Sequence, residues 1–68
     1  METIDARGLS CPEPVVLLQR AMKSNADAYE LLVDNVAAKE NATRFAEHQG
    51  YRVAATETDG EYRLAIAR

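Results

Sequence analysis

Tyr29-Glu30-Leu31-Leu32-Val33, followed at once by Asp34-Asn35, is the stretch that decides the fold. The near-continuous apolar run predicts a central strand that is covered on one face and flanked by strands on both sides. Asp34-Asn35 then offers an N-cap, because an Asp or Asn oxygen accepts hydrogen bonds from the free amides of a helix's first turn. The stretch therefore predicts a strand that leads directly into a helix.

The helix after Asn35 is expected to run to about His48, with Gly50 just past its end, where a left-handed residue is favoured. Its apolar positions recur at helical spacing, and three of them are alanines, which implies that the helix lies close to the sheet. These positions are Ala38, Ala42, Phe45 and Ala46.

Two further strands follow, Tyr51 to Thr58 and Glu61 to Ala67. They are joined by Asp59-Gly60, a dipeptide that favours a type I′ turn and is a strong hairpin signal. Alternation in the last strand places its apolar side chains on one face: Tyr62, Leu64 and Ile66. We therefore expect an antiparallel hairpin at this end of the sequence.

Upstream of the central strand, Thr3 to Ala6 predicts a short first strand with Ile4 pointing inward. A loop through Gly8 leads to a helix over about Pro12 to Lys23, which ends in a polar turn at Ser24–Asp27. The apolar stripe of this helix recurs at helical spacing: Val15, Leu18 and Met22, widened by Leu17 and Ala21.

The expected order is strand, helix, strand, helix, strand, strand, which is βαβαββ. It predicts an α/β fold of the α+β two-layer sandwich type, a four-stranded mixed sheet with two helices on one face. A right-handed crossover places the start of the first helix at one edge of the layer boundary, so a site there should be exposed. Residues 1–68 are expected to form a single domain.

Composition restricts the class of protein. Eleven acidic residues against eight basic ones give a net charge of −3, which, with no aromatic stacking cluster, argues against direct nucleic-acid binding. No apolar run approaches membrane-spanning length, and the N-terminus shows no secretory signal. A single cysteine cannot form an internal disulfide and fits a reducing cytoplasm, so a cytoplasmic location is expected.

That cysteine, Cys11, is the candidate reactive group. With Pro12 at the first helical position, Cys11 falls at the N-cap, where the helix macrodipole favours thiolate over thiol. The helix-terminus effect is worth about 0.3–1 kcal/mol and one pKa unit about 1.4 kcal/mol, so the pKa of the thiol is expected to fall by less than one unit. Glu13 opposes this change, and Arg7 assists it. A thiol with a pKa near ambient pH is well suited to thiol exchange.

Several chemistries are excluded or disfavoured. No second thiol exists for a dithiol–disulfide cycle, and the single histidine, His48, lies at the far end of the second helix. One Cys and one His do not supply the three or four ligands of a metal site, so we expect no metal and no cofactor. Pro12 and Pro14 remove two early helix donors and leave mainly the amide of Glu13 near the sulfur, a poor anion site but a rigid one.

At these residues the chain resembles the TusA/SirA-like sulfur-carrier family, whose signature is Asp-x-x-Gly-Leu-x-Cys-Pro-x-Pro. The matching positions are Asp5, Gly8, Leu9, Cys11, Pro12 and Pro14. The segments 33–41 and 45–51 look most like the YedF branch, in which this domain precedes a DsrE-like domain, so the chain is expected to be a complete small protein or one module of a longer one.

The resemblance implies the same βαβαββ fold and a function. Cys11 would accept sulfane sulfur as a persulfide from a donor such as a cysteine desulfurase or a rhodanese, and would pass it to an acceptor protein such as a DsrE-like one. The implied protein is a sulfurtransferase-like carrier rather than a stand-alone enzyme, acting in tRNA thiolation or selenium-related metabolism. We expect no membrane partner and a monomer when reduced. The alternative is a non-catalytic interaction or regulatory module.

The other signature residues are expected to support the geometry of the site. Asp5 is expected to accept hydrogen bonds from loop amides near Gly8, and Gly8 to adopt a positive φ. For Leu9 two interpretations stay open, a core position or an exposed apolar contact beside the thiol. Asn35 and Asn41 are interpreted as a cap and a surface polar group.

Overall fold

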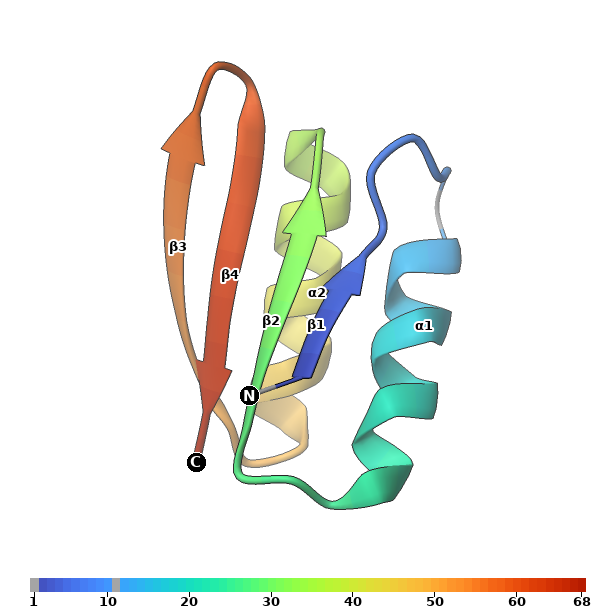
Figure 1. Cartoon of the computed structure of the whole chain (residues 1–68), viewed down its shortest axis with the longest axis vertical. Coiled ribbons are helices and arrows are strands. Elements are labelled where there is room, and N and C mark those ends of the chain that lie inside the picture. The colour runs from blue at the N-terminus through green and yellow to red at the C-terminus, as the bar shows by residue number, and fades with distance from the viewer. Residues whose placement is uncertain (1, 11) are drawn as a thin grey trace.

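The computed structural model describes residues 2–10 and 12–68, and Cys11 lies outside the described residues. A four-stranded sheet carries both helices on one face (Figure 1). Its order is β1-β2-β4-β3, with β1 parallel to β2 and the other two pairs antiparallel. The elements are β1 (Glu2–Asp5), α1 (Glu13–Ala21), β2 (Ala28–Val33), α2 (Val36–His48), β3 (Arg52–Thr58) and β4 (Glu61–Ala67). The predicted βαβαββ sandwich is confirmed.

β2 is the central strand, and its side chains alternate between the two faces. Tyr29, Leu31 and Val33 are fully buried beneath the helices, as the apolar run predicts. Leu31 is the Cα partner of both Ile4 in β1 and Leu64 in β4, so apolar rows cross the sheet on its helix side. The intervening residues of β2 face the open side, where burial is incomplete.

α2 lies close to the sheet because its inner face is built from small residues. Ala38, Ala42 and Ala46 are buried, and Phe45 packs against the core from its margin. The Asn35 side chain accepts a hydrogen bond from the Ala38 amide at 2.8 Å, which confirms the predicted N-cap. At the other end Gly50 has φ +89, the left-handed conformation that glycine adopts without strain.

The hairpin turn between β3 and β4 also follows the prediction. Asp59 and Gly60 both have positive φ, 53° and 80°, as a type I′ turn requires. Strand bounds differ slightly from those expected: β1 is Glu2–Asp5 and β3 begins at Arg52. The Ala6 amide nevertheless still bonds the Leu32 carbonyl at 2.8 Å, so pairing with β2 continues one residue past β1.

α1 is shorter than expected, because a 3-10 turn over Met22–Ser24 replaces its last residues and Asn25 then turns left-handed with φ 57. Below this turn the Tyr29 hydroxyl accepts the Ala26 amide at 2.9 Å, and the Tyr51 hydroxyl donates to the Ala26 carbonyl at 3.0 Å. The two rings meet edge to face with centroids 5.8 Å apart. Within the described residues, neither helix is long and apolar enough to cross a membrane.

Candidate functional site

The loop that leads to Cys11 lies at the end of the sheet where the parallel strands β1 and β2 finish and both helices begin (Figure 1). Cys11 itself is outside the described residues, so the site is built from its neighbours. Ser10 and Pro12, on either side of it in the sequence, are both exposed. His48 ends the 13-residue α2, about 20 Å from the start of that helix at the usual rise per residue.

The start of α1 corrects one expectation. Pro12, rather than Cys11, is the N-cap, and Glu13 is the first helical residue. Pro12 has φ −99 and ψ 19, which are not helical values, and its carbonyl accepts the first helical hydrogen bond from Val16 at 3.1 Å. The Glu13 amide, expected to stay near the sulfur as a donor, bonds the Ser10 carbonyl at 2.9 Å. The Ser10 carbonyl therefore already occupies this donor before the helix begins.

The two prolines of the signature occupy different environments. Pro12 is exposed, whereas the Pro14 ring is fully buried. Pro14 lies four residues before Leu18, so both fall on the helix face that meets the sheet. Pro14 is thus a core residue as well as a helix starter, a role that sequence reasoning missed.

Asp5 and Arg7 form a clamp at the start of the loop. Asp5 Oδ1 accepts the Arg7 amide at 3.1 Å and Arg7 Nε at 2.9 Å, while Oδ2 meets Nη2 at 2.8 Å. Arg7 Nη1 also reaches Glu61 Oε1 at 3.3 Å. Hydrogen bonds from the Arg7 side chain and backbone lower the pKa of Asp5 to about 2, and Asp5 and then Glu61 raise the pKa of Arg7 above its ordinary value. The Arg7 charge, which was expected to assist the thiolate, is therefore already matched by the two carboxylates Asp5 and Glu61.

Gly8 has the positive φ that was predicted, +80. The expectation that Asp5 accepts a hydrogen bond from a loop amide near Gly8 is also confirmed, by the Arg7 amide. The Gly8 amide has a partner that was not expected, since it donates to Asp34 Oδ2 at 2.7 Å. Sequence reasoning considered Asp34 only as part of a helix cap. The predicted topology is the signal that could have found the Gly8–Asp34 contact. Parallel neighbouring strands end at the same edge of the sheet, which brings residues 5–8 beside residues 33–35.

Apolar contacts beside the site are modest. Leu9 is half-buried and packs against the core, between the two interpretations left open for it. Val36, at the first position of α2, is the one large apolar residue classed as exposed in the described part of the chain, at 51%. Leu9 lies within the loop that leads to Cys11, and Val36 directly follows Asp34 and Asn35 in the sequence.

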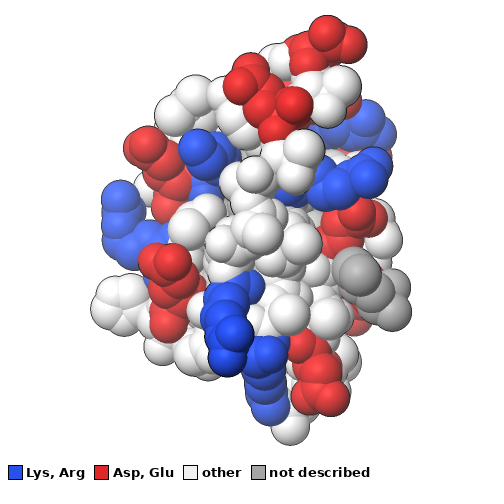
Figure 2. Space-filling model, turned by 90° about the vertical axis from the view of Figure 1, so that its left-hand side faces the viewer, with Lys and Arg blue, Asp and Glu red and all other residues white. Residues whose placement is uncertain are grey.

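Acidic residues predominate at this end of the molecule. Figure 2, which views the molecule from the β3 side, shows acidic side chains at the very top with Lys or Arg side chains close below them. The loops and element ends there carry the acidic residues Asp5, Glu13, Asp34, Glu57, Asp59 and Glu61, and the basic residues Arg7 and Lys39.

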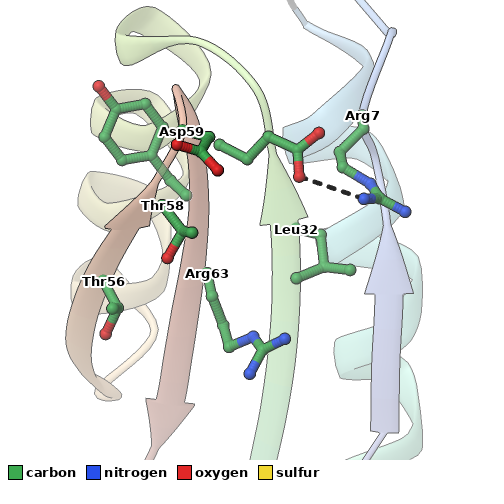
Figure 3. A pocket seen from close by; sticks show the side chains of 8 residues that line it. Arg7, Leu32, Thr56, Thr58, Asp59 and Arg63 are labelled. Carbon is green, nitrogen blue, oxygen red and sulfur yellow. Dashed lines mark hydrogen bonds and ion pairs between the residues drawn. The ribbon is translucent and has the colours of Figure 1, made fainter.

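A hollow of about 560 Å³ lies on the sheet next to the Arg7 clamp (Figure 3). Leu32, Arg63 and Thr56 are Cα partners in a row across β2, β4 and β3 and line it. Arg7 and Arg63 in its lining are balanced by Asp59 and Glu61, so the hollow carries no net charge that would select a charged ligand.

Comparison with known proteins assigns this architecture to a family. Residues 2–68 match the family model described as sulfurtransferase TusA. The chain belongs to the TusA family. It is 38% identical to a candidate sulfur carrier protein of Methanocaldococcus jannaschii, over all of this chain and 95% of the relative. The crystal structure of a SirA-like protein from Desulfitobacterium hafniense superposes with a TM-score of 0.91 at 34% identity, covering 98% of this chain and 96% of that one.

The predicted TusA/SirA-like resemblance is thus confirmed for the family as a whole. Membership in the TusA family groups this chain with sulfur carrier proteins and implies sulfur-relay partners. The closeness to the YedF branch stays a prediction.

Proposed function

We propose that Cys11 is the sulfur-carrying residue and that it holds sulfane sulfur as a persulfide. The observation that carries this proposal is the family match over residues 2–68 in a chain whose sole cysteine stands in the signature. In the transfer step the Cys11 thiolate attacks the terminal sulfur of a donor persulfide. A new S–S bond forms on Cys11, the donor's S–S bond breaks, and the donor leaves as a thiolate. No external oxidant or reductant is needed.

The surroundings favour a carrier that reacts with proteins. The residues flanking Cys11 in sequence are exposed, and the preceding loop is fixed by carboxylates at Arg7 and Gly8. The helix start and the ordered loop give the thiol a defined setting, while specificity comes from docking. Asp5, Gly8, Leu9, Pro12 and Pro14 support this geometry and are not reactive groups.

The specific partners form part of the same proposal. A cysteine desulfurase or a rhodanese supplies the sulfur, and a DsrE-like protein is the first acceptor to test. We place the reaction in the cytoplasm, with the reduced protein as a monomer and with tRNA thiolation or selenium-related metabolism as the pathways to examine.

The deciding experiment is loading followed by intact mass spectrometry. Reduced protein is incubated with a cysteine desulfurase and cysteine, and we expect a mass increase of one sulfur atom that a reductant removes. Cys11→Ser is the control and should show no increase. A wild-type protein that takes no sulfur from a desulfurase, a rhodanese or inorganic polysulfide would refute the carrier role.

The same samples test the alternative of a non-catalytic interaction module. A module of that kind would bind its partner equally well in the wild type and in Cys11→Ser, and neither would gain sulfur. A carrier instead shows transfer to the acceptor that depends on loaded Cys11.

A further inference from the structure

We propose that Asp34 is a positioning residue for sulfur transfer, because its carboxylate holds the loop that carries Cys11. This inference rests on the proposed carrier function. The contact that carries it is the hydrogen bond from the Gly8 amide to Asp34 Oδ2 at 2.7 Å. Bonds from an amide to a carboxylate are among the stronger hydrogen bonds in proteins, because the acceptor carries a full charge.

The Asp34 carboxylate is itself well fixed. Its residue follows Val33, which is fully buried in the central strand, and precedes Asn35, which caps α2. Its second oxygen, Oδ1, accepts from Asn35 Nδ2 at 3.2 Å. Asp34 therefore lies between the end of β2 and the start of α2, and its carboxylate connects the loop to these two elements.

The Asp34 contact differs in kind from the Arg7 clamp. Asp5 lies two residues before Arg7, so this part of the clamp is local to the loop and its strand. Asp34 lies 26 residues from Gly8 and joins the loop of α1 to the start of α2. Gly8 stands three positions before Cys11, so a displaced Gly8 amide displaces the approach to the thiol.

We expect loss of the Gly8–Asp34 hydrogen bond to lower the rate of sulfur transfer more than the free energy of unfolding. Gly8 and Asp34 are both exposed, and a single exposed hydrogen bond contributes little to the free energy of unfolding. A misplacement of about 1 Å in a reacting group can, by contrast, slow a reaction between docked partners by about a hundredfold. A freely diffusing reagent has no such geometric requirement.

Three variants test the proposal. Asp34→Ala removes the acceptor, whereas Asp34→Asn keeps a side-chain carbonyl that can accept the Gly8 amide but removes the charge. Glu57→Ala is the matched control, because it removes one acidic residue of the same end that belongs to the hairpin rather than to the loop. Each protein is reacted with iodoacetamide, loaded with inorganic polysulfide, and loaded by a cysteine desulfurase.

We expect Asp34→Ala to lower kcat/KM for loading by the desulfurase by about tenfold or more, with iodoacetamide and polysulfide rates within about twofold of wild type. Asp34→Asn should restore most of the loss, and Glu57→Ala should behave as wild type. An unchanged Asp34→Ala overturns the proposal. Equal losses in Asp34→Ala and Asp34→Asn also overturn it, because they indicate a charge contact with the partner.

Amide relaxation measured by NMR gives a readout that does not depend on sulfur chemistry. Asp34→Ala should increase the nanosecond mobility of the Gly8, Leu9 and Ser10 amides, and Asp34→Asn should not. Unchanged mobility in Asp34→Ala overturns the proposal even if loading slows. If the wild type accepts no sulfur, the carrier function fails, and this mobility comparison still decides whether Asp34 holds the loop.

Discussion

Arg7 Nη1 lies 3.3 Å from Glu61 Oε1, across 54 positions of the sequence. This contact ties the loop before the candidate thiol to the first residue of β4. The same guanidinium holds Asp5 through its Nε and Nη2 atoms, so one side chain joins the first strand, the loop and the hairpin. The loop is therefore held by charge pairs on one side and by the Asp34 carboxylate on the other.

Asp5 should titrate well below a typical aspartate. Its pKa is lowered from 3.8 to about 2 by hydrogen bonds from Arg7, so the pair's contribution to stability is present above pH 4 and is lost as the pH falls towards 2. Carbon NMR of the Asp5 carboxyl group measures this directly. Arg7→Gln should return the Asp5 pKa towards 3.8, and Glu61→Gln should move it little. An Asp5 that titrates near 3.8 in the wild type would contradict the clamp.

Pro14→Ala should destabilise the protein, and Pro12→Ala should not. Pro14 is fully buried, so the variant loses two core methylene groups and leaves a small cavity, a cost of roughly 1–3 kcal/mol. Pro12 is exposed and serves as the matched control. Urea unfolding measures both changes. Equal stability of the two variants would show that the Pro14 ring does not contribute to the core.

Sulfur transfer should distinguish the role of Pro14 in core packing from its role at the start of the helix. Because the helix start is expected to set the direction of the thiol, Pro14→Ala should react with iodoacetamide at close to the wild-type rate but load from a desulfurase more slowly. Both rates are measured on samples shown to be folded by circular dichroism. Equal slowing of the two reactions would indicate lost thiol activation instead.

Alkylation of Cys11 should become faster as salt is added. We expect the excess of acidic residues at this end of the molecule to disfavour a thiolate. Raising the ionic strength from about 0.01 M to about 1 M shortens the screening length from about 30 Å to about 3 Å and should weaken that effect. We expect the iodoacetamide rate at pH 7 to rise by about twofold. A rate that falls with salt would mean that the positive end of α1 dominates.

Oxidation in air should yield a disulfide-linked dimer, because each chain has one cysteine. The reduced protein is expected to be a monomer, and a reductant should dissolve the dimer. Size-exclusion chromatography with and without reductant measures both states. A reduced sample that stays dimeric at micromolar concentration would reveal a non-covalent interface.

The fold could be predicted because its signals are local. The central strand, the Asn35 cap, the Gly50 terminus and the Asp59-Gly60 turn each depend on a few neighbouring residues. The predicted start of α1 was wrong by one residue, because the φ of Pro12 suits either the N-cap or the first helical position, and only the hydrogen bonds of Glu13 and Val16 distinguish the two.

The contacts that hold the loop before Cys11 could not be predicted from local sequence signals. Gly8 and Asp34 meet only because β1 and β2 are parallel neighbours, and Arg7 meets Glu61 only because the hairpin folds back beside them. Neither pair leaves a spacing signal in the sequence. The burial of Pro14 was missed for a related reason, since a proline at a helix start is explained by backbone geometry before its packing is considered.

The Arg7–Glu61 contact has a consequence for synthesis on the ribosome. The cysteine leaves the exit tunnel early, whereas the carboxylate that completes the clamp is translated 54 residues after Arg7. A nascent chain that stops short of position 61 already has its thiol but not the fastened loop. The Arg7 clamp can therefore close only after synthesis has passed position 61 and the hairpin has paired with β2, so an intact clamp marks a completely folded sheet.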